Sequence, residues 1–157
     1  MRYLMSNQNK KKICLISSSG GHYEQLKMLS VLEDEYDIFW VTEKSDYKSS
    51  SDYYLLQTGM KDKLFPFKML LNFFKTLKIW FKEKPDYVIT TGAMVVVPMA
   101  FLAKLFKRKL IYIETFARVY DGTRTGKLLY KHADLFLVQW EQLKEVYPDA
   151  KYGGGLY

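Results

Sequence analysis

The stretch that decides the fold is KICLISSSGGHYEQL, residues 12–26, in which an apolar run stops at Ser17-Ser-Ser-Gly-Gly-His22 and a helix-compatible segment follows. A buried strand, a glycine turn and a helix arrange backbone N–H groups into a cup that binds anions, because glycine turns without a Cβ in the way. The loop lacks the Gly-Lys-Thr end of a Walker A loop and does not match the Gly-x-Gly-x-x-Gly dinucleotide-binding motif, so by itself it is a less specific signal. Ser19, Gly20 and Gly21 are candidates for phosphate binding. His22 is the candidate catalytic base, and helix capping with loop packing is its alternative role.

Length and composition indicate one globular domain with an aromatic, basic surface. At 157 residues the chain is too small for two nucleotide-fold domains side by side. Aromatic residues make up 17% of it, so part of that surface is expected to face a membrane or a partner. The 24 basic residues against 17 acidic ones give a net charge of +7, which suits anionic lipid head groups, phosphates or nucleic acid.

The cysteine, the histidines and the amino terminus indicate the compartment of the protein, whether it binds a metal and how it could contact a membrane. Cys14 is the single cysteine, so we expect it in the core of a protein from a reducing cytosol. One cysteine with His22 and His132 does not make a metal site, and no metal is predicted. Residues 1–12 lack the apolar h-region of about 7–15 residues that a signal peptide requires. Any membrane contact is therefore expected to be peripheral.

Strand and helix patterns alternate along the chain. Continuous Val/Ile/Leu-rich runs indicate strands that are covered on both faces, joined by right-handed crossovers. Strands are predicted at 13–17, 37–42, 53–57, 87–91, 109–114 and 135–138, and helices at 23–32, 67–82, 95–106, 125–132 and 142–147. The series predicts an α/β, Rossmann-like fold with a mostly parallel sheet and helices on both faces. Residues 1–11 are expected to be a flexible basic amino terminus, and residues 12–157 the domain.

The carboxyl ends of the predicted strands carry polar loops at 17–22, 42–46, 90–93 and 114–118. In such sheets, ligands bind beyond these ends, at a switch point in strand order, so the loops are expected to converge on one cleft. Thr91, Gly92 and Glu114 belong to these loops and are predicted to bind the acceptor or its phosphates. Glu43 and Asp46 are common loop carboxylates whose geometry nothing fixes, and we do not assign them a role.

The segment PFKMLLNFFKTLKIWFKEKP, residues 66–85, predicts a helix with an unusually broad apolar arc and a lysine side. Such a helix lies in a lipid interface while its lysines reach toward phosphates. The residues predicted to face the membrane are Phe67, Leu70, Leu71, Phe74 and Trp80. A buried helix with a solvated lysine face is the equally weighted alternative. Residues 93–106 form a second apolar stretch, too short to span a bilayer.

Together these motifs resemble a known family. The chain is similar to the membrane-associated subunit of the bipartite UDP-GlcNAc transferase that adds the second sugar of dolichol-linked oligosaccharides. It resembles still more the bacterial accessory subunits of capsular and exopolysaccharide glycosyltransferases. The resemblance rests on Ser18–His22, Thr90–Gly92 with Pro98, Ile113–Arg118, Thr125–Lys127, Ala133–Trp140 and Tyr147-Pro148. Thr115 stands where serine is expected and keeps the hydroxyl.

The resemblance implies the amino-terminal half of a GT-B glycosyltransferase, which faces a lipid-linked acceptor. The other half, which grips the UDP-sugar, is absent, and the chain stops at 153–157, where the interdomain connection would begin. The resemblance therefore implies no cofactor in this chain, with the UDP-sugar donor bound mainly by a separate catalytic subunit. It also implies an inverting transfer that gives a β-linkage.

Roles for single residues follow from the resemblance together with residue chemistry. Arg118 is expected to pair with the acceptor pyrophosphate or, equally, with Glu114. Thr125 is expected to cap a helix that carries Gly126 and Lys127 in its first turn, where a lysine opposes the helix dipole and suggests an anion nearby. Thr125, Gly126 and Lys127 are therefore predicted to bind the acceptor or its phosphates. The predicted partner-binding residues are Trp140, Tyr147, Leu156 and Tyr157.

The leading hypothesis is a non-autonomous glycosyltransferase subunit on the cytoplasmic face of the membrane. It binds a polyprenyl-diphosphate-linked glycan and recruits the donor-binding subunit. The alternative is a membrane-recruiting scaffold with no part in the active site. A third class, a nucleotide-binding or nucleic-acid-binding protein, is disfavoured because Thr42-Glu43 matches only loosely the acidic ribose ligand expected after the second strand, so no nucleic acid partner is predicted.

Overall fold

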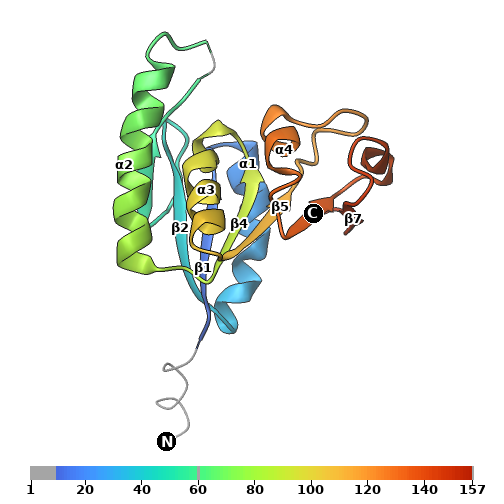
Figure 1. Cartoon of the computed structure of the whole chain (residues 1–157), viewed down its shortest axis with the longest axis horizontal. Helices are drawn as coiled ribbons and strands as arrows, with labels where there is room; N and C mark the ends of the chain where they lie inside the picture. Colours follow the sequence, from blue (N-terminus) through green and yellow to red (C-terminus); the bar gives the residue numbers. More distant parts are fainter. Residues whose placement is uncertain (1–9, 60, 157) are drawn as a thin grey trace, which may run out of the picture.

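The computed structural model describes residues 10–59 and 61–156, and forms one seven-stranded sheet, in the order β3-β2-β1-β4-β5-β6-β7, with every neighbouring pair parallel (Figure 1). The strands are β1 Lys12–Ser17, β2 Asp37–Lys44, β3 Tyr53–Leu56, β4 Tyr87–Gly92, β5 Lys109–Ile113, β6 Leu135–Val138 and β7 Lys151–Tyr152. The parallel, Rossmann-like sheet predicted from the sequence is confirmed. Residues 1–9 of the predicted flexible terminus lie outside the described residues.

Helices cover both faces of this sheet. The α-helices are α1 Gly21–Lys27, α2 Phe65–Glu83, α3 Val97–Leu105 and α4 Arg124–Leu129, and the 3₁₀ segments are η1 Met28–Asp34, η2 Met94–Val96 and η3 Glu141–Glu145. In Figure 1, α2 and α3 lie in front of the strands, and α1 lies behind them. The two-sided arrangement matches the sequence prediction.

The alternation of side chains along β1 explains why both faces need cover. Cys14 and Ile16 belong to the core that contains Trp80 of α2 and Met99 of α3. Ile13 and Leu15, in between, belong to a second core with Leu26 of α1. Because successive strand residues point to opposite faces, a continuous apolar run fills two cores.

Helix α2 shows which part of the predicted lipid-facing arc is free. Phe67, Leu70, Leu71 and Phe74 are between 38% and 59% exposed. The prediction is wrong for Trp80, which is 3% exposed and whose ring stacks on Phe106, with 5.5 Å between ring centroids. Trp80 occupies the side of the helix that packs on the sheet. No helix in the described part of the chain combines the length and apolarity needed to cross a bilayer.

Several element boundaries differ from those predicted. The predicted helix 23–32 is α1 followed by the 3₁₀ segment η1, and the predicted helix 142–147 is the 3₁₀ segment η3. Helix α4 is capped by Thr123, not by Thr125, because the Thr123 side chain accepts a hydrogen bond from the Gly126 N–H at 2.9 Å. Strand β7 was not predicted, since two residues carry no periodicity.

Candidate functional site

His22 lies at the carboxyl edge of the sheet, in the first turn of α1. It follows Gly20, whose φ of +79° is a conformation that favours glycine. A Cβ at Gly20 or at Gly21 would meet no atom within 4 Å, so the backbone here is open to an approaching group. The loop predicted at 17–22 therefore presents Gly20, Gly21 and a half-buried His22 together.

A bulge in β4 aims Thr91 at this histidine. The pairing of β1 with β4 passes from Ile16–Thr90 to Ser17–Gly92, which leaves Thr91 as the extra residue. The Thr91 carbonyl oxygen lies 2.7 Å from Nδ1 of His22, and the Thr91 hydroxyl donates to the His22 carbonyl oxygen at 2.7 Å. The first contact orients the imidazole ring, and the second ties the His22 backbone to β4.

The same contacts set the tautomer of His22. A carbonyl oxygen only accepts, so the hydrogen bond with Thr91 requires the proton on Nδ1 and leaves the Nε2 lone pair unprotonated in the neutral ring. Burial lowers the pKa of His22 from its usual 6.5, against smaller opposing effects of the Thr91 carbonyl and of the carboxylates Glu114 and Glu43. Neutral His22 is therefore chemically suited to accept a proton at Nε2.

Gly92 keeps the neighbouring backbone close to Tyr112. Its φ is +108°, and an added Cβ would lie 2.6 Å from the Tyr112 hydroxyl and 3.6 Å from Cε1 of His22. Burial raises the pKa of Tyr112, so its hydroxyl remains protonated and contacts Oγ1 of Thr123 at 3.1 Å. Thr91 and Gly92 are themselves buried, and they position the edge rather than expose side chains to a ligand.

Glu114 is fully buried and has a different role from the one predicted. Its carboxylate accepts hydrogen bonds from the backbone N–H of Thr115 at 2.9 Å and from the hydroxyl of Tyr147 at 2.8 Å. Thr123 donates to it through both its N–H, at 3.1 Å, and its hydroxyl, at 3.0 Å. These donors occupy both oxygens, so Glu114 is not presented to an acceptor and instead fixes the loop from 115 to 123.

Tyr147 was predicted to contact a partner, and this prediction is wrong. Its side chain is 1% exposed, and its ring lies 4.6 Å from that of Phe136. Desolvation and the Glu114 carboxylate raise the pKa of Tyr147, so the phenol keeps its proton and donates it. The ring is buried in the apolar core, and its hydroxyl finds a partner there in the Glu114 carboxylate.

The start of α4 is tightly packed around the same carboxylate. A Cβ on Gly126 would lie 2.2 Å from Oε2 of Glu114, so the glycine allows the helix to approach. Thr125 is 3% exposed and Gly126 is buried, so the prediction that these two residues contact a phosphate is wrong. Their contribution is to the position of the exposed Lys127 beside them.

Arg118 and Lys127 come together through Asp121. Lys127 lies 2.7 Å from one carboxylate oxygen of Asp121 and Arg118 lies 3.5 Å from the other, so Arg118 does not pair with Glu114. Lys127, followed by Arg118, lowers the pKa of Asp121. All three side chains are at least half exposed. The loop 118–127 thus holds two cations on one carboxylate at the sheet edge.

A buried pair of amides, Gln25 and Gln139, connects α1 to the residues that directly follow β5, and this pair was not predicted. Nε2 of Gln139 lies 2.7 Å from Oε1 of Gln25, which also accepts from the backbone N–H of Phe116 at 3.1 Å. Oε1 of Gln139 accepts from the N–H of Leu156 at 2.9 Å. A glutamine three residues after a histidine gives no sequence signal of burial, because the network depends on strand neighbours far along the chain.

The two other predicted partner residues within the described chain stay close to the surface. Trp140 and Leu156 are both partly buried. The indole N–H of Trp140 donates to the Phe116 carbonyl at 2.7 Å, and the two rings lie 4.7 Å apart. Tyr157 lies outside the described residues, and Ser19 is half-buried in the first loop.

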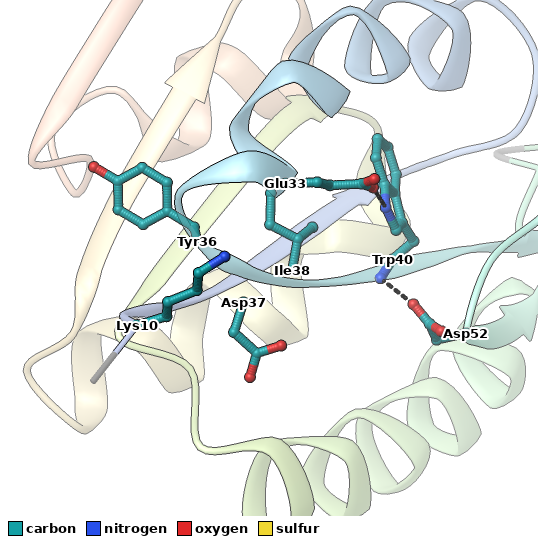
Figure 2. A pocket seen from close by; sticks show the side chains of 7 residues that line it. All are labelled: Lys10, Glu33, Tyr36, Asp37, Ile38, Trp40 and Asp52. Carbon is teal, nitrogen blue, oxygen red and sulfur yellow. Dashed lines mark hydrogen bonds between the residues drawn. The ribbon is translucent and has the colours of Figure 1, made fainter. Parts of the chain in front are cut away.

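One hollow lies away from this edge, at the start of β2. It has a volume of about 550 Å³, and Figure 2 shows Trp40 at its side with Glu33 and Asp52. Glu33 accepts from the indole N–H of Trp40 at 2.8 Å, and Asp52 accepts from the Trp40 backbone N–H at 2.8 Å. Its carboxylates are thus bound to the chain itself, and none of the predicted site residues lines it.

Comparison with known proteins identifies the family. Residues 63–156, more than half of the chain, match the family model described as "Oligosaccharide biosynthesis protein Alg14 like". The chain belongs to the Alg14-like family. The matched range contains the carboxyl ends of β4, β5 and β6, and so most of the site described above.

Sequence relatives cover nearly the whole chain. It is 30% identical to the UDP-N-acetylglucosamine transferase subunit ALG14 of Yarrowia lipolytica, over 87% of this chain and 64% of that protein. It is 29% identical to the subunit alg14 of Schizosaccharomyces pombe, over 92% of this chain and 83% of that protein. The chain thus spans somewhat under two thirds of the Yarrowia protein.

The fold has counterparts among larger solved structures. The structure of MurG from Acinetobacter baumannii superposes with a TM-score of 0.65 at 15% identity, over 84% of this chain and 42% of that one. The present domain therefore corresponds to less than half of such a protein. This agrees with the Rossmann-like GT-B half-domain predicted from the sequence.

Proposed function

We propose that this Alg14-like chain is the acceptor-side subunit of a UDP-GlcNAc-dependent glycosyltransferase that acts on a polyprenyl-diphosphate-linked glycan. The observation that carries the proposal is the hydrogen bond between Nδ1 of His22 and the Thr91 carbonyl, beside the open glycine loop. It leaves Nε2 as a proton acceptor at the edge where parallel α/β sheets bind ligands. The names of the relatives supply the donor, UDP-GlcNAc.

The proposed chemistry needs a base on this chain and a donor on another. Nε2 of His22 takes the proton of the acceptor hydroxyl while that oxygen bonds to the anomeric carbon of the donor sugar. The bond from this carbon to UDP breaks at the opposite face, and the nucleotide leaves with the electron pair. The hydroxyl oxygen attacks the face opposite UDP, so the configuration of the anomeric carbon is inverted and a β-linkage forms.

The donor is assigned to a separate catalytic subunit. A GT-B active site lies between two half-domains, and this chain supplies one of them, corresponding to 42% of the MurG chain. In the proposal, Trp140 and Leu156, with Tyr157, contact the partner. No cofactor is assigned to this chain, since the UDP-sugar belongs mainly to that subunit.

Arg118 and Lys127 are proposed to bind the acceptor diphosphate. Their shared partner, Asp121, neutralises one of two charges, and all three side chains are solvent-accessible. A diphosphate offers oxygens to both cations at once, which a single carboxylate does not fully satisfy. The buried carboxylate of Glu114 holds the loop that carries them, because it accepts hydrogen bonds from the N–H and the hydroxyl of Thr123.

The proposed location is the cytoplasmic face of a membrane, as a peripheral protein. The predicted membrane-facing residues Phe67, Leu70, Leu71 and Phe74 of α2 are exposed, as is Phe81, and Lys75 and Lys78 lie on the same helix. Large apolar side chains with a lysine rim suit a lipid interface. The narrower prediction of a bacterial capsular or exopolysaccharide pathway forms part of this proposal.

The test is reconstitution. Transfer from radiolabelled UDP-GlcNAc to a short-chain lipid diphosphate-linked GlcNAc is measured with this chain alone, with the donor-binding subunit alone, and with both. Only the mixture is expected to transfer. Robust transfer by this chain alone would show that it is not a half-site.

A scaffold without a part in the active site is the second candidate, favoured by the exposed apolar face of α2, which serves docking without chemistry. His22→Ala and Arg118→Ala separate the two functions. A scaffold predicts normal transfer in a complex that still assembles. An acceptor site predicts an intact complex with slow transfer.

A further inference from the structure

An apolar groove separates α3 from α4 on the sheet face that carries the larger core. It is lined by Val97, Ala100 and Phe101 of α3 and by Leu128 and Leu129 of α4, with a volume of about 190 Å³. Phe101 is 55% exposed and Leu128 is 49% exposed, so two large side chains form its walls while remaining in contact with solvent. Lys104 and His132 complete the lining, and no carboxylate contributes to it in the described part of the chain.

The groove lies between two helices that both begin at the edge where the candidate site lies. Helix α3 follows β4, which ends at Gly92, and α4 follows β5 and the Glu114 loop. Both helices run back from the carboxyl edge of a parallel sheet, so both begin at the edge where His22 and Lys127 lie. Leu128 directly follows Lys127, and α3 from Val97 to Lys104 extends the groove for about 10 Å at 1.5 Å per residue.

The charge at the mouth of the groove differs sharply from its lining. The loop 118–127 carries three cationic side chains, of Arg118, Arg124 and Lys127, and one carboxylate, of Asp121. The groove that leaves this loop is apolar along both walls. A ligand that matches both parts has a diphosphate at one end and a branched hydrocarbon directly attached to it.

We propose that this groove holds the first isoprene units of the acceptor's polyprenyl chain, as it leaves the diphosphate bound at the loop. The inference rests on the proposed function and adds the path of the lipid to it. The narrow volume suits one chain, whereas the exposed residues Phe67, Leu70, Leu71 and Phe74 of α2 do not line it. The hollow of about 250 Å³ against α2 is lined by Tyr53, Tyr54, Ile79 and three lysines, on a helix that does not follow the basic loop. The acceptor would therefore be held by its own lipid as well as by its charge.

The experiment is calorimetric titration of the purified chain with inorganic diphosphate and with farnesyl diphosphate below its micelle concentration. Phe101→Asp and Leu128→Asp place a carboxylate on each wall of the groove. Val31→Asp is the matched control, since Val31 is 72% exposed and lies in η1 on the other side of the sheet. Phe67→Asp tests the α2 face. Thermal unfolding of each variant verifies that it is folded, and exposed positions were chosen for that reason.

The prenyl chain is expected to tighten binding at least tenfold, about 1.4 kcal/mol, relative to inorganic diphosphate. In Phe101→Asp and Leu128→Asp, farnesyl diphosphate should bind no more tightly than inorganic diphosphate binds to the same variant, a comparison that cancels any repulsion of the diphosphate by the added carboxylate. Val31→Asp and Phe67→Asp should preserve the gain. A gain that survives in both groove variants, that is lost in Phe67→Asp, or that is absent from the unmodified chain overturns the inference.

The outcome for the groove is separate from the outcome for the basic loop. If farnesyl diphosphate binds through the groove but inorganic diphosphate does not bind at all, the groove is supported, and the phosphate role of Arg118 and Lys127 is contradicted. If inorganic diphosphate binds and the prenyl chain adds nothing, the loop stands, and the groove inference fails.

Discussion

The hydroxyl of Tyr147 is expected to stabilise the fold through Glu114, and Tyr147→Phe tests this with the loss of a single oxygen. The ring stays in its place against Phe136, so the substitution leaves the apolar packing unchanged. What is lost is the hydrogen bond of 2.8 Å that the phenol donates to Oε2 of Glu114. The carboxylate keeps its donors from Thr115 and Thr123.

The magnitude follows from the nature of this bond. Hydrogen bonds to charged groups contribute about 1.5–3 kcal/mol, and Glu114 is fully buried, so we expect the free energy of unfolding to fall by about 2 kcal/mol. For a domain of this size, that corresponds to a decrease in Tm of about 4–8 °C. Glu114→Gln should cost more, about 3 kcal/mol, because an amide NH₂ in either orientation faces an N–H or O–H donor.

The assay is urea unfolding followed by circular dichroism, with the slope m required to stay constant. Tyr152→Phe, at a residue that is 54% exposed, is the control and should change stability by less than about 0.5 kcal/mol. A double-mutant cycle of Tyr147→Phe with Glu114→Gln should show a coupling energy above about 1 kcal/mol. Equal stability of Tyr147→Phe and the unmodified chain would refute the stabilising role of the hydrogen bond between Tyr147 and Glu114.

Three further predictions concern the carboxyl edge of the sheet and the exposed face of α2. Gly92→Ala should destabilise the chain by about 1–3 kcal/mol because of its positive φ and the close Tyr112 hydroxyl, whereas Gly21→Ala, with open space for a Cβ, should not, and thermal unfolding compares the two. The lowered pKa of His22 means that the unfolded chain binds more protons below pH 6.5, so the free energy of unfolding should fall as the pH drops below that value. His22→Gln should remove this part of the slope in urea unfolding from about pH 5 to pH 8, and an unchanged slope would contradict the assignment. Phe67→Asp should weaken sedimentation with anionic vesicles at least tenfold, about 1.4 kcal/mol, whereas Val31→Asp should leave it unchanged.

The order of elements followed from the sequence because local pattern decides it. Apolar runs such as 13–17 predict strands buried on both faces, and the glycines after them predict where the chain turns. Parallel pairing then places the carboxyl ends at one edge. His22, Thr91 and Glu114 come to that edge for this reason, although they lie far apart along the chain.

The roles of single residues were harder to predict because they depend on contacts across the sheet. From residue type alone, an aromatic residue such as Trp80 or Tyr147 suits a buried position as well as an exposed contact surface. Only the packing shows that both are buried. Thr123 and Thr125 are equally good caps by residue type, and the buried Glu114 selects Thr123. The backbone carbonyl that orients His22 belongs to a β-bulge, which no residue type announces.

The central claim is that this chain supplies the base of a shared active site, and the turnover of the assembled complex with His22→Ala tests it most directly. General-base catalysis contributes about 10²- to 10⁴-fold, so transfer from UDP-GlcNAc should fall by at least 100-fold while the complex still forms and still binds the lipid acceptor. Turnover equal to that of the unmodified complex, with the same acceptor affinity, would contradict the account.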